Sequence, residues 1–245
     1  MIHALALETS HPIGSVVLRR GDGLIVRAEL TERGGQARAL APAIRDLLRQ
    51  AALTPRDLGL VVVGLGPGGY TGLRLGLATA KTLAVVLRIP ILGVTSTSVL
   101  ATAREVPAGP VLACVEATQE FVYGQAFDKR ADGSLTTLCE PFIEPATVAA
   151  AMLRPNTAVV GSGARRIASC AADGARNRPA HAGLEDLMPR AEDLLNLGLS
   201  RHARGEADDE RALLPLYLRP SEAERLWERR QAAAMPNDIG RAGSA

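Results

Sequence analysis

The 245-residue chain has few aromatic residues, few cysteines and few lysines. Phe, Trp and Tyr make up 3% of it, which leaves little surface on which RNA bases could stack. Cys114, Cys139 and Cys170 are odd in number and far apart, so we expect reduced thiols in the core of a cytoplasmic protein. The 28 basic residues include only the lysines Lys81 and Lys129, and the net charge of +2 argues against strong electrostatic binding of nucleic acid.

Long apolar runs and metal-ligand patterns are also missing. No uncharged apolar run reaches the roughly 18 residues of a membrane span, and the first residues lack a basic stretch before an apolar one. We therefore expect neither a membrane span nor a secretory signal. No histidines pair at i, i+4 and none lies in a cysteine cluster, so we expect no metal, no cofactor and surface positions for His3, His11, His181 and His202.

The chain does contain a regular alternation of apolar segments and turn residues. In the first half it predicts strands over 2–8, 15–20, 24–29, 60–63 and 91–95, with helices over 38–52 and 72–87. In the second half it predicts strands over 111–116, 121–127, 135–142 and 158–161, with helices over 189–204 and 222–234. This order indicates an α/β protein with two mixed sheets covered by helices. We expect an N-terminal lobe over 1–104, a C-terminal lobe over 105–225, and a helix end and flexible tail over 226–245.

The strongest local signal is the string Gly-Leu-Gly-Pro-Gly-Gly-Tyr-Thr-Gly at 64–72, between a predicted strand and a predicted helix. A dinucleotide site needs an acidic residue about 20 positions further on, and the segment 89–95 contains none. A P-loop needs Lys after its last glycine, where this chain has Leu73. Two readings remain: the turn holds an anion at the helix start, or it only needs positive φ and close packing. The candidate anion-binding residues are Gly66, Gly68, Gly69 and Thr71.

The helix that follows carries a stripe of small residues, Gly72, Gly76, Ala80 and Ala84, at intervals of four. Each interior glycine costs about 1 kcal/mol relative to alanine, which makes sense where another backbone approaches closely. That backbone belongs either to a second chain or to the first helix of the same chain. In the first case, leucine at Gly76 or Ala80 should disrupt association and spare the fold.

Glu8, Thr9 and Ser10 end the first predicted strand. A carboxylate followed by two hydroxyls is how actin-like sugar kinases and ATPases begin their phosphate hairpin, although such a turn can equally be satisfied by its own side chains. A stand-alone actin-like ATP-dependent phosphotransferase is therefore one candidate function. Gly-Ser-Gly at 161–163 would be its second phosphate loop, but Asp57, at a helix-to-strand junction, is badly placed for a general base.

Several segments together resemble the TsaB (YeaZ) family. They are Glu8-Thr9-Ser10, the glycine string extended to 64–74, Ile-Pro-Ile-Leu-Gly-Val-Thr-Ser at 89–96 and, more weakly, 115–123 and 215–224. The pattern Gly-Pro-Gly-x-Tyr/Phe-Thr-Gly-x-Arg is specific to this family, whereas the tripeptide is not. The chain departs from the family where Glu8 replaces the usual Asp, where Gly35-Gln36 replaces a common His-Ser, and where Thr118-Gln119 replaces an Arg-rich piece.

The resemblance implies an actin-like, two-lobed α/β fold and a non-catalytic scaffold subunit for tRNA modification. The implied partners are the paralogue TsaD, which transfers threonylcarbamoyl to N6 of adenosine 37 in tRNAs reading A-starting codons, and the ATPase TsaE. Contact with tRNA would occur only through this complex, and a homodimer can form when the chain is alone. Family dimers join through helices of the N-terminal lobe, which implies an interface at Arg45, Arg49, Gly72, Leu73, Gly76, Ala80 and Ala84.

Overall fold

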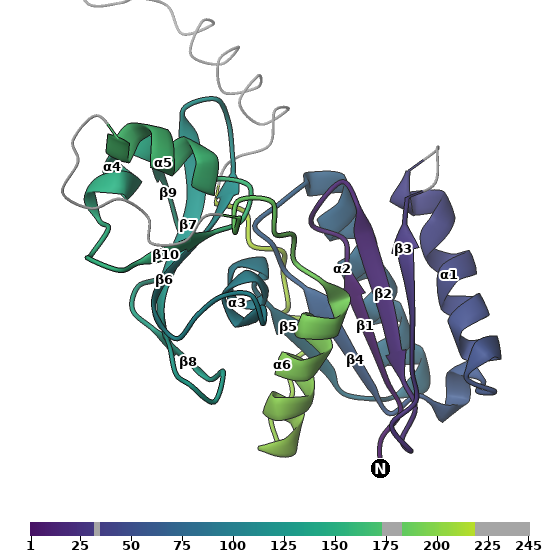
Figure 1. Cartoon of the computed structure of the whole chain (residues 1–245). Coiled ribbons are helices and arrows are strands. Elements are labelled where there is room, and N and C mark those ends of the chain that lie inside the picture. The colour runs from purple at the N-terminus through teal and green to yellow at the C-terminus, as the bar shows by residue number, and fades with distance from the viewer. Residues whose placement is uncertain (32–34, 173–182, 219–245) are drawn as a thin grey trace, which may run out of the picture.

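The computed structural model describes residues 1–31, 35–172 and 183–218. These residues form two lobes, each built on a five-stranded sheet (Figure 1). The predicted helix over 222–234, the tail over 226–245 and His181 lie outside the described residues.

The first sheet has the order β3-β2-β1-β4-β5. Its strands are β1 (Ala4–Glu8), β2 (Gly14–Arg19), β3 (Ile25–Leu30), β4 (Leu60–Gly64) and β5 (Ile91–Val94). The first three form an antiparallel meander, while β1, β4 and β5 run parallel, so the sheet is mixed as predicted. The continuous apolar run of β4 is buried throughout, as expected for a central parallel strand.

Helices cover both faces of this sheet. Helices α1 (Gln36–Gln50) and α2 (Tyr70–Leu87) pack on one face with the side chains of Leu5 and Leu7, and α6 (Ala191–Ala203) packs on the other face with Ala4 and Ala6. The strand period of two explains this division, because successive side chains of β1 point to opposite faces. Helix α6 lies in the range predicted for the second lobe, yet it packs on the first sheet.

The second sheet has the order β10-β6-β7-β8, with β9 also paired to β7. Its strands are β6 (Gly109–Glu116), β7 (Phe121–Lys129), β8 (Leu135–Thr137), β9 (Phe142–Pro145) and β10 (Ala158–Val160). The single strand predicted over 135–142 is therefore wrong. Both β8 and β9 pair with β7, and the chain leaves the ladder between them, where Pro141 has no N–H to donate.

Three helices were not predicted: α3 (Ser96–Thr102), α4 (Ala146–Ala151) and α5 (Ala164–Ala172). Helix α3 lies between the lobes (Figure 1), where Val99 packs into the core beside α6 and Leu100 packs into the core of the second sheet. Its Ser-Thr-Ser start disfavours a helix locally, but the Thr95 side chain caps it by accepting from Ser98 N. Helices α4 and α5 cover the opposite face of the second sheet.

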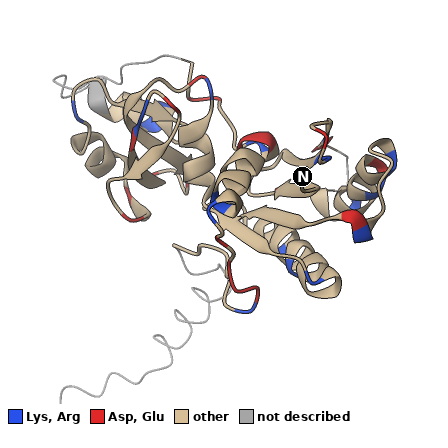
Figure 2. Cartoon of the chain, turned by 90° about the horizontal axis from the view of Figure 1, so that it is seen from below, with Lys and Arg blue, Asp and Glu red and all other residues tan. Residues whose placement is uncertain are grey.

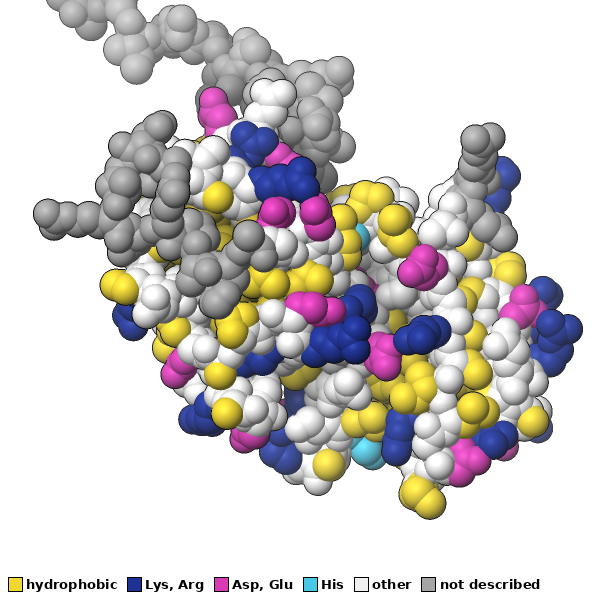
Figure 3. Space-filling model, in the orientation of Figure 1, with side chains coloured by type: hydrophobic (Ala, Val, Ile, Leu, Met, Phe, Trp, Pro, Cys, Tyr) yellow, Lys and Arg dark blue, Asp and Glu magenta, His cyan; other side chains and the backbone are white. Residues whose placement is uncertain are grey.

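Charges of both signs are interspersed over both lobes (Figure 2). In the space-filling view, a row of alternating basic and acidic side chains crosses the middle of the molecule (Figure 3). Ion pairs between distant segments include Arg190 with Glu105 and Arg27 with Glu192. In the described part of the chain, no helix combines the length and the apolar character that crossing a membrane requires.

Candidate functional site

The candidate site lies where β1 and β4 end. These strands are parallel neighbours, with Leu7 opposite Val63, so their carboxyl ends meet at one edge of the sheet. The turn after β1 carries Glu8, Thr9 and Ser10, and the turn after β4 carries the glycine string and leads into α2. The fold therefore places the two groups of candidate residues side by side.

The glycine turn packs directly onto the first hairpin. A Cβ atom at Gly68 would overlap the carbonyl of Ser10, and one at Gly72 would overlap the carbonyl of Thr9. Gly66 adopts φ 92° in this turn, a conformation that favours glycine. Close packing and positive φ thus account for the glycines, and the hairpin backbone occupies the space beside them.

The small-residue stripe of α2 meets this same hairpin. A Cβ atom at Gly76 would overlap the hydroxyl of Thr9, and Leu73, Ala80 and Ala84 are buried against the chain itself. Within the chain, the close approach at Gly72 comes from the backbone of Thr9 and the side chain of Gln36 on α1, and the approach at Gly76 comes from the Thr9 side chain. Contact of this stripe with a second chain stays a prediction.

Arg45 and Arg49 have the opposite environment. Their side chains project from α1 and remain 77% and 80% exposed, with only loose ion pairs to Asp46 at 3.9 and 3.6 Å. They are accessible to a partner, whereas Leu73 and the inner positions of α2 are not.

Several polar groups at the junction hydrogen-bond to one another, although His11 Nε2 and Gln36 Oε1 are buried without a partner among the described residues. Ser10 N donates to Glu8 Oε1 at 2.8 Å, and Gly69 N donates to Ser10 O at 2.7 Å. Thr9 Oγ1 donates to Gly72 O at 2.8 Å. The amide and hydroxyl groups that would contact a phosphate in an open hairpin are thus engaged within the chain.

Glu8 is almost completely buried, and the carboxylate lies so close to β4 that a Cβ atom at Gly64 would overlap it. Burial raises the pKa of Glu8, and hydrogen bonds from Ser10 and Ser96 only partly oppose this effect. No ion pair to Glu8 occurs in the described ranges. A buried carboxyl group that has no cation beside it is poorly suited to bind a metal-bound water molecule.

Ser96 and His11 complete the buried network and were missed as site residues. Ser96 Oγ lies 3.0 Å from Ser10 Oγ and 3.3 Å from Glu8 Oε2. Ser96 follows β5, which runs parallel beside β4, so its place at this edge could have been inferred from the strand order.

The surface position expected for His11 is wrong, because it is only 6% exposed, with Nδ1 3.2 Å from Ser10 Oγ. Burial lowers the pKa of His11 to about 4, so the imidazole is neutral at pH 7. Gln36 at the start of α1 donates through Nε2 to His11 O, which ties the first helix to the same turn. The Gly35-Gln36 departure from the family pattern therefore lies next to the site.

The candidate second phosphate loop also packs against its own lobe. Ser162 Oγ accepts from Glu116 N at 3.1 Å, and a Cβ atom at Gly161 would overlap the carbonyl of Cys114. Asp57 caps its own 3-10 turn (Pro55–Asp57) by accepting from Thr54 N and Oγ1. Both features are thus engaged in local contacts of their own segments.

An aromatic clamp lies at the start of α2. The Tyr70 and Tyr217 rings stack with centroids 5.0 Å apart, and the Arg74 guanidinium lies 3.9 Å from the Tyr70 centroid. Arg74 Nε also donates to Tyr217 Oη at 2.8 Å, and Leu216 N donates to Leu65 O at 2.8 Å. The segment before residue 218 is thereby fastened across the flank of the glycine turn. Over 1–31, 35–172 and 183–218, no three His, Cys, Asp or Glu side chains gather as metal ligands would.

Comparison with known proteins assigns a family to this arrangement. The family model "TsaD: tRNA N6-adenosine threonylcarbamoyltransferase" matches residues 34–174, more than half of the chain. The chain is 28% identical over 225 residues to the tRNA threonylcarbamoyladenosine biosynthesis protein TsaB of Escherichia coli, covering 88% of this chain and 94% of that one. It is 41% identical over 98 residues to the Bacillus subtilis protein of the same name, covering 40% of this chain and 42% of that one.

A solved structure extends the likeness to the whole fold. YeaZ from Pseudomonas aeruginosa is 29% identical to this chain and superposes on it with a TM-score of 0.76. The superposition covers 89% of this chain and 100% of YeaZ. The two-lobed, actin-like α/β fold is thereby confirmed. With sequence and structure in agreement over most of its length, this chain belongs to the TsaB (YeaZ) family.

Proposed function

We propose that this chain acts in the biosynthesis of threonylcarbamoyladenosine in tRNA, as a non-catalytic scaffold subunit that pairs with TsaD and recruits TsaE. The names of its relatives and the match to the TsaD family model support this pathway. In this role the chain provides a folded surface, and the transfer of the threonylcarbamoyl group takes place on its partner.

The closed junction between the first hairpin and the glycine turn is the observation that carries the proposal. Gly68 lies against Ser10 and Gly72 lies against Thr9, so a phosphate has no space between the two turns. The alternative, a stand-alone phosphotransferase, would need an accessible carboxylate, and the Glu8 carboxyl is buried with a raised pKa.

The outer face of α2 and the neighbouring α1 offer the docking surface. Ala78, Thr82 and Val85 lie on the exposed side of α2, and Val85 is 57% exposed despite being apolar. Together with Arg45 and Arg49 on α1, these exposed residues form the proposed contact with TsaD.

A reconstituted modification assay tests the scaffold role. On a tRNA reading A-starting codons, activity should require this chain together with TsaD and TsaE, and omission of any one should abolish it. Activity of this chain alone, or unchanged activity without it, would overturn the proposal.

The docking surface is tested with one pair of variants. Val85→Arg on α2 should weaken the complex with TsaD and leave the melting temperature unchanged, because the side chain is exposed. Val148→Arg on α4 is the matched control, because it places the same charge on an exposed apolar position of the second lobe. Equal complex formation by both variants would exclude the outer face of α2.

Nucleotide binding separates the two candidate functions. Titration calorimetry of the isolated chain with ATP and Mg²⁺ should show no saturable binding. Saturable binding with turnover in the absence of a partner would instead favour the phosphotransferase.

A further inference from the structure

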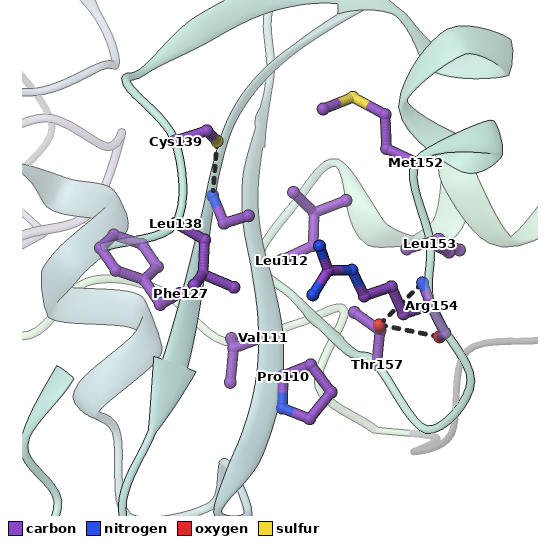
Figure 4. Close-up of a pocket in the computed structure, with 11 residues that line it drawn as sticks. Pro110, Val111, Leu112, Phe127, Leu138, Cys139, Met152, Leu153, Arg154 and Thr157 are labelled. Atoms are coloured by element: carbon purple, nitrogen blue, oxygen red, sulfur yellow. Dashed lines mark hydrogen bonds between the residues drawn. The ribbon is translucent and has the colours of Figure 1, made fainter. Parts of the chain in front are cut away.

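A pocket of about 150 Å³ opens in the second lobe, far along the chain from the glycine turn. It lies between the face of the second sheet that α4 covers and the loop that joins α4 to β10 (Figure 4). Its walls are largely apolar and come from Leu112, Phe127, Leu138, Met152 and Leu153. Leu138 and Met152 remain 46% and 49% exposed, so the apolar surface continues to the mouth of the pocket.

One cationic side chain, that of the solvent-exposed Arg154, lines this apolar space at its open side. The guanidinium of Arg154 points into the pocket between Leu112 and Thr157 (Figure 4). Within the described residues the guanidinium has no hydrogen bond and no ion pair, and no Asp or Glu lines the pocket. A positive charge beside apolar walls, without an anion of its own, is complementary to a ligand that supplies one.

The backbone that presents Arg154 is held in place. Thr157 Oγ1 donates to Arg154 O at 2.8 Å and accepts from Arg154 N at 3.1 Å, and Thr157 itself is buried. Cys139 on the opposite side is likewise engaged, because its sulfur accepts from Ala126 N at 3.3 Å. Both segments at the sides of the pocket are therefore held in place without a ligand. Binding then loses less conformational entropy than it would in a pocket that had to be ordered first.

Size and charge together restrict the ligand. A volume of about 150 Å³ is enough for one benzene-sized group. A carboxylate can accept two parallel hydrogen bonds from a guanidinium. An ammonium group on the same ligand would find no carboxylate among the lining residues, so free amino acids do not suit the pocket.

We propose that this pocket binds a small monocarboxylic acid that carries an aromatic or branched aliphatic group and no free amine. Its apolar group lies against Leu112 and Met152, and its carboxylate pairs with Arg154. This binding is independent of the proposed scaffold function and requires no other component.

Benzoate and its neutral isostere benzamide are the probes for a titration of the full chain, followed by amide NMR shifts. Benzoate should bind with a dissociation constant on the order of 1 mM, and benzamide about tenfold more weakly because it lacks the charge. The shifts should fall on the pocket walls, Leu112, Ala126 and Thr157 among them.

Arg154→Gln should weaken benzoate binding about tenfold and leave benzamide binding unchanged. Arg104→Gln, which removes a guanidinium whose side chain is 88% exposed outside the pocket, is the control and should bind benzoate as the wild type does. Ala126→Leu fills the pocket and should abolish both, with folding checked by circular dichroism. Equal affinity for benzoate and benzamide, an unchanged Arg154→Gln, or the absence of saturable binding would each overturn the proposal.

Discussion

The glycine junction of the first lobe and the Arg154 pocket of the second lobe differ in how their space is filled. At the junction, glycines let backbone segments touch, and Glu8, Ser10 and Ser96 hydrogen-bond to one another. In the pocket, largely apolar side chains leave about 150 Å³ beside the Arg154 guanidinium, which has no ion pair among the described residues. Residue types typical of phosphate sites therefore mark the closed region, and ordinary apolar residues mark the open one. Available space and unpaired charge, more than residue type, distinguish a ligand site from packing.

The largest effect is expected from a substitution that forces the junction open. Gly76→Leu should lower the free energy of unfolding by about 3 kcal/mol or more, because the new side chain has no space beside Thr9. Urea denaturation measures this loss. The control is Ala78→Leu, two residues along the same helix and exposed, which should be within about 0.5 kcal/mol of wild type. A stable, monomeric Gly76→Leu protein would contradict the internal packing.

A second test removes a satisfied polar group from the other lobe. Lys129 is 8% exposed and donates to the carbonyls of Ala103 and Val106 at 2.7 and 2.9 Å. Lys129→Met keeps the apolar stem but leaves both carbonyls without this donor, which should cost about 2 kcal/mol in thermal or urea unfolding. Lys81→Met on α2 is the control and should change stability by less than about 0.5 kcal/mol. Equal effects of the two variants would show that the buried lysine is dispensable.

The aromatic clamp that borders the junction should contribute less. Tyr217→Ala removes the stack on Tyr70 and the hydrogen bond from Arg74, with an expected loss of about 1 kcal/mol. Tyr217→Phe keeps the stack and should lose only part of this amount. Limited proteolysis should show faster cleavage near residue 217 in the alanine variant, and unchanged cleavage would mean that the other contacts hold the segment by themselves.

The smallest effect at any one pH is expected from Glu8→Gln, because the amide retains the acceptor for Ser10 N. Burial raises the pKa of Glu8 in the folded state, so its contribution to stability is greatest at low pH and is lost as the pH rises from about 4.5 through the folded-state value. The stability of wild type relative to Glu8→Gln should therefore fall as the pH rises above about 4.5. A difference that grows with pH would mean that the folded protein favours the ionised carboxyl.

Part of the fold follows from local pattern. The strands at 4–8, 14–19, 25–30 and 60–64 and the helices α1, α2 and α6 lie close to their predicted ranges, because their apolar periodicity is strong. Helices α3, α4 and α5 escaped prediction because they are short or begin with poor helix formers, and contacts with distant strands stabilise them.

The alternation of strands and helices, the need for a close contact at Gly72 and Gly76, and the family signature of the glycine string can all be recognised in the sequence. The contact of Thr9 with α2, the burial of His11 and the position of Arg154 beside an apolar pocket are visible only in the assembled fold. The two groups of features differ in the distance along the chain between the residues that determine them. Periodicity and glycine spacing are set within a few turns of the chain, whereas burial and free space depend on segments that meet only when the sheets are assembled.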